Sequence, residues 1–470
     1  MFLKKSALLN KCIKMMLCFI AIYICLYPGM IFAAEENYYT ISTEKHEEYD
    51  NLIDVAKKYD AAITYEVKEL GIIQVKASKD VIEKIGKDPL VGTYNVSLRT
   101  TSLNDLEKGK SIKPEDAELW NVQWDMKKVT NNGESYKLFS GTKNVTVGII
   151  DSGLDIKHPD LQRSIVSGSK NLVPSGGFRG KETEETGDEN QLTDNLGHGT
   201  HVAGQVAADG KIKGVAPGIG IKSYRVIGER TGEAIWIIKA IIEAAKDGVD
   251  VINISLGNYL IDGSAFLGNQ ETRTDKVEIN AFKEALKFAE KQGSVVVAAA
   301  GNDSLNVNDH QQMYKFLKKK LRQDELTLKG RLIDVPASLS GVVTVASVGP
   351  TNELSTFSNY GDNYIDIAAP GGDNKLLIQY GITYWLDHQL EKKEKVLSTG
   401  PDQEYFYDAG NSVATPKVSG TLALIIDKQK LKKQPNRTVQ FLYENGIDKT
   451  IDNDKRLSCG ILNTYKAMAK

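Results

Sequence analysis

The chain has 470 residues, of which 41% are hydrophobic and 26% charged, and its 59 Lys and Arg nearly balance its 61 Asp and Glu. This composition excludes a disordered chain, a collagen and a multi-pass membrane protein. The near-neutral balance gives no global basic field, so no nucleic-acid partner is expected. Three of the four cysteines lie within the first 25 residues and leave Cys459 alone, which excludes a disulfide framework.

The N-terminus has the pattern of a secretory signal peptide. Four lysines precede the uncharged run Met15–Tyr27, and the chain then passes Ala33 and Ala34 before it turns acidic at Glu35. We expect residues 1–34 to be removed on export, although the apolar stretch also approaches the length of a retained membrane anchor. A secreted mature chain with one thiol suits the exterior of a Gram-positive bacterium.

Residues 35–99 predict a small α/β domain. Strand patterns and two amphipathic helical patterns follow one another in the order βαββαβ, which is the ferredoxin-like arrangement. The polar residues 100–118, with a Gly and a Pro, indicate a linker. The strand patterns are 39–42, 63–67, 72–77 and 91–98, and the helical patterns are 45–59 and 81–85.

Residues 119–470 predict a larger domain in which apolar strand runs alternate with helical patterns. Apolar strands separated by helices indicate a parallel sheet covered on both faces, so we expect a doubly wound α/β fold. Functional residues of such a fold lie near the carboxyl ends of its strands. The segments that carry the pattern are 145–150, 202–208, 221–227, 234–246, 249–254, 279–292, 294–300, 342–348, 365–368 and 412–427.

Three polar residues of the larger domain stand in distinctive surroundings. Asp151 directly follows the first apolar strand, His198 begins a helix within the sequence GHGTHVAG, and Ser412 leads into an apolar helix. Each has an ordinary alternative: Asp151 suits a turn, His198 with His201 suits a metal ion, and Ser412 suits a helix cap. Because no Glu or third ligand accompanies the two histidines on their helix, we expect no metal there.

Taken together, these motifs resemble those of the subtilisin family of serine peptidases, in which the residues occur in the same order Asp, His, Ser. The resemblance extends from about residue 123 to the C-terminus and implies a subtilisin-like fold. It rests on the three motifs and on further matches in the family's order. These are His158–Leu161, Gly214–Pro217, Ser255–Gly257, Ala300–Asn302 and Thr356–Gly361.

The resemblance implies a serine endopeptidase. Ser412 is then the nucleophile, His198 the general base, and Asp151 the group that orients and stabilises the imidazolium. Asn302 and the backbone NH of Ser412 form the oxyanion hole. His201 is structural.

The sequence departs from the family's pattern on both sides of the nucleophile. The family usually has Thr before the Ser and Met after it, whereas this chain has Asn411 and Val413. Neither change removes a reacting group, so we expect activity to persist. These two residues leave the detailed geometry of the oxyanion hole open.

By the same resemblance, Ser255, Leu256 and Gly257 pair with an extended substrate, and Asp334 stands at the base of the pocket for the residue before the cut. A carboxylate there would bind a guanidinium or ammonium group. An alternative remains, because residues 303–332 form a longer stretch than usual. Asp334 would then be a solvated loop residue.

The small domain resembles a subtilase propeptide, which acts as folding chaperone and inhibitor and lies with its last strand in the active site. Arg99, at the end of that strand, is the only Arg among the first 162 residues. An Arg-selective protease would find one site for self-processing there, so we predict autocleavage between Arg99 and Thr100. The alternative is a simple compositional bias toward Lys.

The whole pattern resembles the lantibiotic leader peptidases, which remove the leader from a ribosomally made, modified precursor, typically after Arg. The pattern comprises the signal, the propeptide, the Asp-based pocket and an insertion at residues 372–408. A broad-specificity secreted subtilase is the alternative, and an inactive peptide-binding module with this fold is the second. We expect a monomer whose partners are the precursor leader and its own propeptide.

No cofactor is expected to be required. Calcium is common in the family, but the loop after Ala208, residues 209–213, is shorter than the usual calcium-binding version. Asp160 alone resembles a ligand position, which gives calcium only weak support.

Overall fold

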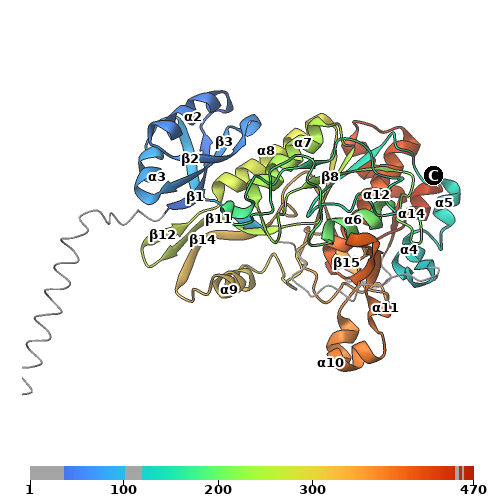
Figure 1. Cartoon of the computed structure of the whole chain (residues 1–470). Coiled ribbons are helices and arrows are strands. Elements are labelled where there is room, and N and C mark those ends of the chain that lie inside the picture. Colours follow the sequence, from blue (N-terminus) through green and yellow to red (C-terminus); the bar gives the residue numbers. More distant parts are fainter. Residues whose placement is uncertain (1–35, 101–118, 450–454, 458–459) are drawn as a thin grey trace, which may run out of the picture.

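The computed structural model describes residues 36–100, 119–449, 455–457 and 460–470 (Figure 1). The predicted signal peptide, nearly all of the predicted linker and Cys459 lie outside these residues. The N-terminal residues form a separate lobe that packs against one side of a larger body (Figure 1). Within the described residues, no helix has the length and apolar character needed to span a bilayer.

The N-terminal lobe is a four-stranded antiparallel sheet in the order β2-β3-β1-β4, with two helices that share its core. The connectivity βαββαβ is the predicted ferredoxin-like topology. Side chains alternate between the two faces of a strand, so Ile41, Ile73 and Val75 point to the helices. The elements are β1 (Glu36–Thr43), α2 (Tyr49–Lys58), β2 (Ala62–Val67), β3 (Ile72–Ser78), α3 (Lys79–Ile85) and β4 (Val91–Val96).

The larger body is built on a nine-stranded sheet in the order β19-β20-β16-β15-β13-β10-β6-β8-β7. All neighbouring strands are parallel except the β19–β20 pair at one edge. The strands are β6 (Thr146–Asp151), β7 (Lys170–Asn171), β8 (Gly220–Arg225), β10 (Val251–Ile254), β13 (Val295–Ala299), β15 (Val342–Val348), β16 (Ile367–Pro370), β19 (Ile447–Asp448) and β20 (Ile461–Leu462).

Helices cover both faces of this sheet. On one face α6 (His198–Ala207) and α12 (Asn411–Gln429) pack against Val147 and Val297, and on the other α7 (Ala234–Lys246) and α8 (Lys276–Gln292) pack against Ile150 and Val296. Apolar residues on both faces of the central strands are therefore buried, which explains the continuous apolar runs in the sequence. The predicted doubly wound fold is confirmed.

The long stretch before residue 333 forms structure of its own. Strand β11 (Asn258–Leu267) pairs with β12 (Gln270–Arg273) on one side and with β14 (Leu326–Val335) on the other, and α9 (His310–Leu321) packs against β14. The antiparallel register places Asp334 opposite Tyr259. This pairing brings Asp334 back to the main body.

The predicted insertion has two parts. Helices α10 (Lys375–Asp387) and α11 (Glu391–Glu394) project from the body (Figure 1). The hairpin of β17 (Val396–Thr399) and β18 (Tyr405–Asp408) instead packs on α6. Ser398 Oγ and Thr399 Oγ1 donate to the carbonyls of His201 and Thr200, each at 2.7 Å.

The face of the N-terminal sheet opposite its two helices docks on α7 and α8, and a carboxyl group is buried at this contact. Asn95 Nδ2 donates to Glu278 Oε2 at 2.6 Å, and Asn95 Oδ1 accepts from the Val277 NH at 3.1 Å. Burial, with the nearby charge of Asp275, outweighs the hydrogen bonds from Asn95 and Thr40 and raises the pKa of Glu278 to about 8. Docking is therefore linked to protonation of Glu278.

We predict that the two lobes separate more readily as pH rises. When the lobes part, Glu278 meets water and its pKa returns to about 4.5, so the stabilisation of docking is complete below that pH and is lost as pH rises through about 8. Amide hydrogen exchange of β4 in the intact chain, corrected for intrinsic rates, measures this opening.

Glu278→Gln mimics the protonated carboxyl, so its β4 protection should stay flat over the same pH range. Glu290→Gln, at an exposed position of α8, is the matched control and should behave as the unmodified chain. Equal pH dependence in Glu278→Gln would contradict the linkage.

Candidate active site

Asp151 and His198 meet at the carboxyl edge of the main sheet. Asp151 is the last residue of β6 and His198 the first of α6, and Asp151 Oδ1 lies 2.8 Å from His198 Nδ1. Both side chains are buried. The NH of Ser152 donates to the same carboxylate oxygen at 2.7 Å. His198 faces this carboxylate, whereas His201 Nε2 lies 3.3 Å from the Val396 carbonyl.

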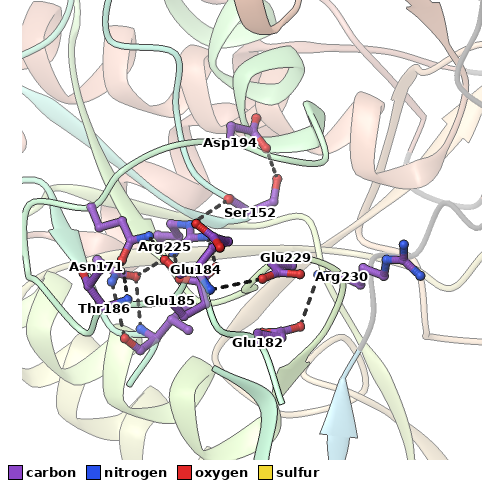
Figure 2. Close-up of polar contacts among 12 residues, drawn as sticks. Ser152, Asn171, Glu182, Glu184, Glu185, Thr186, Asp194, Arg225, Glu229 and Arg230 are labelled. Carbon is purple, nitrogen blue, oxygen red and sulfur yellow. Dashed lines mark hydrogen bonds and ion pairs between the residues drawn. The ribbon is translucent and has the colours of Figure 1, made fainter. Parts of the chain in front are cut away.

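The relative placement of β6 and α6 is fixed by Asp194, which sequence reasoning missed. Ser152 Oγ donates to Asp194 Oδ1 at 2.8 Å, a contact drawn in Figure 2. The NH groups of Gly197 and Thr200 donate to the two oxygens of Asp194 at 2.7 and 2.8 Å. A carboxylate on the first NH groups of a helix satisfies donors that have no partner within the helix. Asp194 therefore ties the residue after Asp151 to the turn that carries His198.

The charge balance at His198 favours the protonated ring. Burial disfavours the imidazolium, but the charge and hydrogen bond of Asp151, with the more distant Asp408 and Asp194, outweigh it and raise the pKa of His198 to about 9. His201 has the opposite balance: burial lowers its pKa to about 4. Its Nε2 lies 3.3 Å from the Val396 carbonyl, so this ring holds the β17–β18 hairpin, in keeping with a structural role.

Ser412 is the second residue of α12 and is fully buried. Its carbonyl accepts from Ser255 Oγ at 2.8 Å, which connects α12 to the end of β10. Within the described residues, Ser412 Oγ and His198 Nε2 are both buried atoms without a hydrogen-bond partner. Buried polar atoms are normally paired. Asp151 Oδ2 and His201 Nδ1 are unpaired at the same place, and the Ser412 and His198 atoms are those between which a serine nucleophile and a histidine base would transfer a proton.

The two amides beside Ser412 are oriented by specific contacts. Asn302 Oδ1 accepts from the Asn411 NH at 3.0 Å, so the Nδ2 group of Asn302 is the one that an oxyanion hole would use. Asn411, the residue that departs from the family's Thr, donates to the Gly301 carbonyl at 2.7 Å and accepts from the Ser347 NH at 2.5 Å. Asn411 thus links the start of α12 to the strand ends around Asn302. Val413, the residue that stands where the family has Met, is buried and apolar.

Of the predicted substrate-binding residues, Ser255 and Leu256 are fully buried after β10 and Gly257 is half-buried. Asp334 is only 1% exposed and belongs to β14, so the alternative of a solvated loop residue is wrong. Its Oδ2 accepts from three donors: Tyr364 OH at 2.6 Å, the Gly301 NH at 2.9 Å and Asn359 Nδ2 at 3.3 Å. Burial outweighs these bonds and raises the pKa of Asp334 to about 6.

Arg99 is not brought to Asp334. Arg99 and Thr100 form β5 (Arg99–Thr100), which pairs antiparallel with β9 (Gly232–Glu233). Arg99 Nε donates to Thr231 Oγ1 at 2.8 Å, and the guanidinium lies 5.6 Å from the ring centre of Phe178. In this arrangement the contacts of Arg99 are with β9 and its neighbours rather than with the predicted pocket.

Asp160, the predicted single calcium-ligand position, is engaged by the protein itself. Its Oδ2 accepts from the Ile212 NH at 3.0 Å and from Tyr405 OH at 2.9 Å. The described part of the chain has no group of three His, Cys, Asp or Glu side chains arranged to hold a metal ion. Tyr405 comes from the insertion, so the inserted hairpin supplies a donor to this carboxylate.

A buried lysine, also missed from the sequence, connects three helices beneath Ser412. Lys417 Nζ lies 2.9 Å from Asp125 Oδ2 and donates to Gln205 Oε1 at 2.5 Å. Gln205 is on α6, and Asp125 is on α4 (Trp124–Val129), at the start of the larger body. Both charged side chains are completely buried. Lys417 therefore fixes α12 relative to α4 through Asp125 and relative to α6, the helix that carries His198, through Gln205.

We predict that Lys417→Met lowers the free energy of unfolding by roughly 3–5 kcal/mol, because Asp125 would stay buried without its countercharge. Urea denaturation measures the loss. Lys287→Met, at an exposed position of α8, is the control and should change little. The double variant with Asp125→Asn should regain part of the loss. A double variant as unstable as the sum of the single changes would contradict a coupled pair.

Comparisons with known proteins agree with this geometry. The model of the family described as the subtilase family matches residues 142–460. The epidermin leader peptide-processing serine protease EpiP of Staphylococcus epidermidis is 40% identical over 444 residues, which cover 92% of this chain and 93% of that protein. The nisin leader peptide-processing serine protease NisP of Lactococcus lactis is 43% identical over 342 residues, 73% of this chain and 49% of that protein.

Solved structures give the same result. The crystal structure of EpiP from Staphylococcus aureus has a TM-score of 0.81 and 40% identity, and covers 93% of this chain and 98% of that one. The crystal structure of NisP from Lactococcus lactis has a TM-score of 0.69 and 41% identity, and covers 75% of this chain and 95% of that one.

Proposed function

Because this chain belongs to the subtilase family and is a serine endopeptidase, we propose that it removes the leader peptide from a lantibiotic precursor by cutting after an arginine. The observation that carries the substrate choice is the buried carboxylate of Asp334 beside Gly301, the neighbour of Asn302. The similarity to EpiP, a leader peptidase by name, over 92% of the chain supports the same choice.

In the proposed mechanism, Ser412 Oγ attacks the carbonyl carbon of the scissile bond while His198 Nε2 takes its proton. Asp151 holds the ring so that Nε2 faces the serine and balances the charge of the imidazolium. Asn302 Nδ2 and the Ser412 NH stabilise the oxyanion. The imidazolium then gives its proton to the leaving amine, and a water activated by the same ring hydrolyses the acyl-enzyme.

Asp334 is proposed to select arginine. Its carboxyl group is ionised above about pH 6, and a buried anion is unfavourable without a countercharge. A substrate guanidinium would supply that charge and donate hydrogen bonds as well. The ring hydroxyl of Tyr364 and the amide of Asn359 hold the carboxylate in place for this contact.

The N-terminal lobe is proposed to be a propeptide that inhibits the protease, and residues 1–34 a signal that directs secretion. Support for an inhibitory role comes from β5, which occupies the edge of β9 as a bound peptide would. Self-cleavage between Arg99 and Thr100 stays a prediction. It requires β5 to leave β9, because Arg99 is held there by Thr231.

We predict that Asp334→Asn reduces kcat/KM for a peptide with Arg before the cut by roughly 10²-fold or more, because the guanidinium would lose its charged partner. Asn keeps the shape of the Asp334 side chain but not its charge, whereas the second variant, Asp334→Gly, removes the whole side chain. Cleavage of a matched Phe peptide should not fall in parallel. Asp324→Asn, on an exposed turn, serves as control. An unchanged ratio of Arg to Phe cleavage would reject the assignment of Asp334.

We also predict that self-cleavage of the intact chain accelerates from neutral pH to about 9. His198 must be neutral to accept the serine proton, and with the lobe docked its pKa is about 9. The neutral fraction therefore grows up to about tenfold per pH unit below that value. Rates from gel densitometry should follow this slope in the Glu278→Gln chain, in which lobe opening does not vary with pH, and Ser412→Ala should release nothing. A rate that is independent of pH would contradict His198 as the base.

The mature N-terminus is expected at Thr100. Intact-mass measurement of the processed protein gives it directly, and Arg99→Gln should abolish or move the cut. The control is Lys87→Gln, which changes an exposed basic residue of the same lobe. A mature chain that begins far from Thr100 would show that Arg99 has another role.

A further inference from the structure

The last residues of the N-terminal lobe contact two segments of the larger body, and we call the binding surface that these two segments form the groove. One segment is β9 with its neighbours, residues 231–234. The other is residues 174–189, which we call the Phe178 loop. Besides the β5–β9 pairing, three bonds hold the main chain there. They run from Arg179 Nη2 to the Ser97 carbonyl at 3.0 Å, from the Ala234 NH to the Leu98 carbonyl at 2.9 Å, and from Thr231 Oγ1 to the Thr100 carbonyl at 2.8 Å.

One side chain in the groove is recognised individually. The Arg99 guanidinium faces the ring of Phe178 at 5.6 Å, and its Nε donates to Thr231 Oγ1 at 2.8 Å. The guanidinium of Arg179 also lies 4.9 Å from the Phe178 ring. A flat cation on an aromatic ring with a hydroxyl acceptor beside it is a selective contact, whereas main-chain pairing accepts any residue.

Besides its contacts with the N-terminal lobe, the Phe178 loop has contacts within the larger body that do not involve the peptide in the groove. Figure 2 shows Glu185 against Arg225, and the two bonds of this fully buried ion pair are each 2.6 Å long. Glu182 accepts from the NH of Phe178 at 3.0 Å and from the NH of Arg230 at 3.3 Å. These contacts remain when the lobe leaves, so the groove is preformed.

The charge of the loop favours a cation. The Phe178 loop contains five Asp and Glu against two basic residues, Arg179 and Lys181. Glu229 faces the same region and accepts from the Glu184 NH (Figure 2). Arg179 is itself paired with Glu233, which limits its repulsion of a second guanidinium.

We infer that the Phe178 loop and residues 231–234 form a second recognition site for the substrate, distinct from the Asp334 pocket. It binds an extended segment upstream of the cut, takes an arginine or lysine side chain on Phe178 and Thr231, and binds a carbonyl two residues earlier through Arg179. This inference rests on the proposed function. It adds to that function a requirement for a second basic residue in the leader.

The test uses enzyme that has processed itself from the full chain and two sets of fluorogenic peptides with Arg before the cut. The short peptide ends before it can reach β9. The long peptides extend upstream by several residues and carry one Arg, moved along otherwise Gly- and Ala-based positions. We expect one position to raise kcat/KM by roughly fivefold through a lower KM, as a cation–π contact and one hydrogen bond would.

Phe178→Ala should abolish this gain, and Arg179→Gly should raise KM for all long peptides alike; neither change should affect the short peptide. Glycine is chosen because Arg179 has a φ of 55°, a conformation that glycine adopts without strain. Arg437→Ala, an exposed arginine on α13 (Pro435–Asn445), is the control and should keep the gain.

The outcomes separate the two proposals. If the short peptide is cut but no upstream Arg increases the rate, or if the gain survives in Phe178→Ala, the second site is rejected and the proposed peptidase stands. If peptides with Arg before the cut are not cleaved at all, the proposed function itself fails.

Discussion

The carboxylate of Asp194 holds the end of β6 against the start of α6, and the distance between Asp151 and His198 depends on that contact. A parallel sheet covered by helices on both faces leaves its strand ends as the place where polar groups gather. Backbone NH groups at the start of α6 have no partner within the helix. Asp194 accepts from two of them and from Ser152, so it satisfies these donors and at the same time connects the two proposed catalytic side chains rigidly.

A second buried charged side chain holds α12 in place in a similar way. Lys417 lies one and a half turns beyond Ser412 and joins α6 through Gln205 and α4 through Asp125. A buried ion pair contributes little net stability, but it tolerates few alternative arrangements, since a displaced partner leaves an unpaired charge. The serine and histidine helices are thus fixed to each other at the site and below it.

The sequence predicted the fold well because its signals are local. Apolar runs of strand length between helical patterns define the doubly wound sheet, and the βαββαβ order defines the N-terminal lobe. Short motifs predicted the proposed triad, and two of its members, Asp151 and His198, are in contact. What the sequence could not provide depends on long-range contacts. Asp125 and Lys417 have no common motif, and the burial of Asp334 follows from the pairing of β11 with β14. The position of Arg99 follows from the pairing of β5 with β9, which lies far along the chain.

One groove serves two peptides in the proposed enzyme, and their competition favours the attached one. A covalently linked segment is present at an effective concentration in the millimolar range when the linker permits binding. A free substrate with the same main-chain contacts cannot displace it until the lobe opens. Selection by side chains therefore has to act after the lobe departs, on a groove that is already formed. The buried Arg225–Glu185 pair meets that need, because it shapes the Phe178 loop without any contribution from the bound segment.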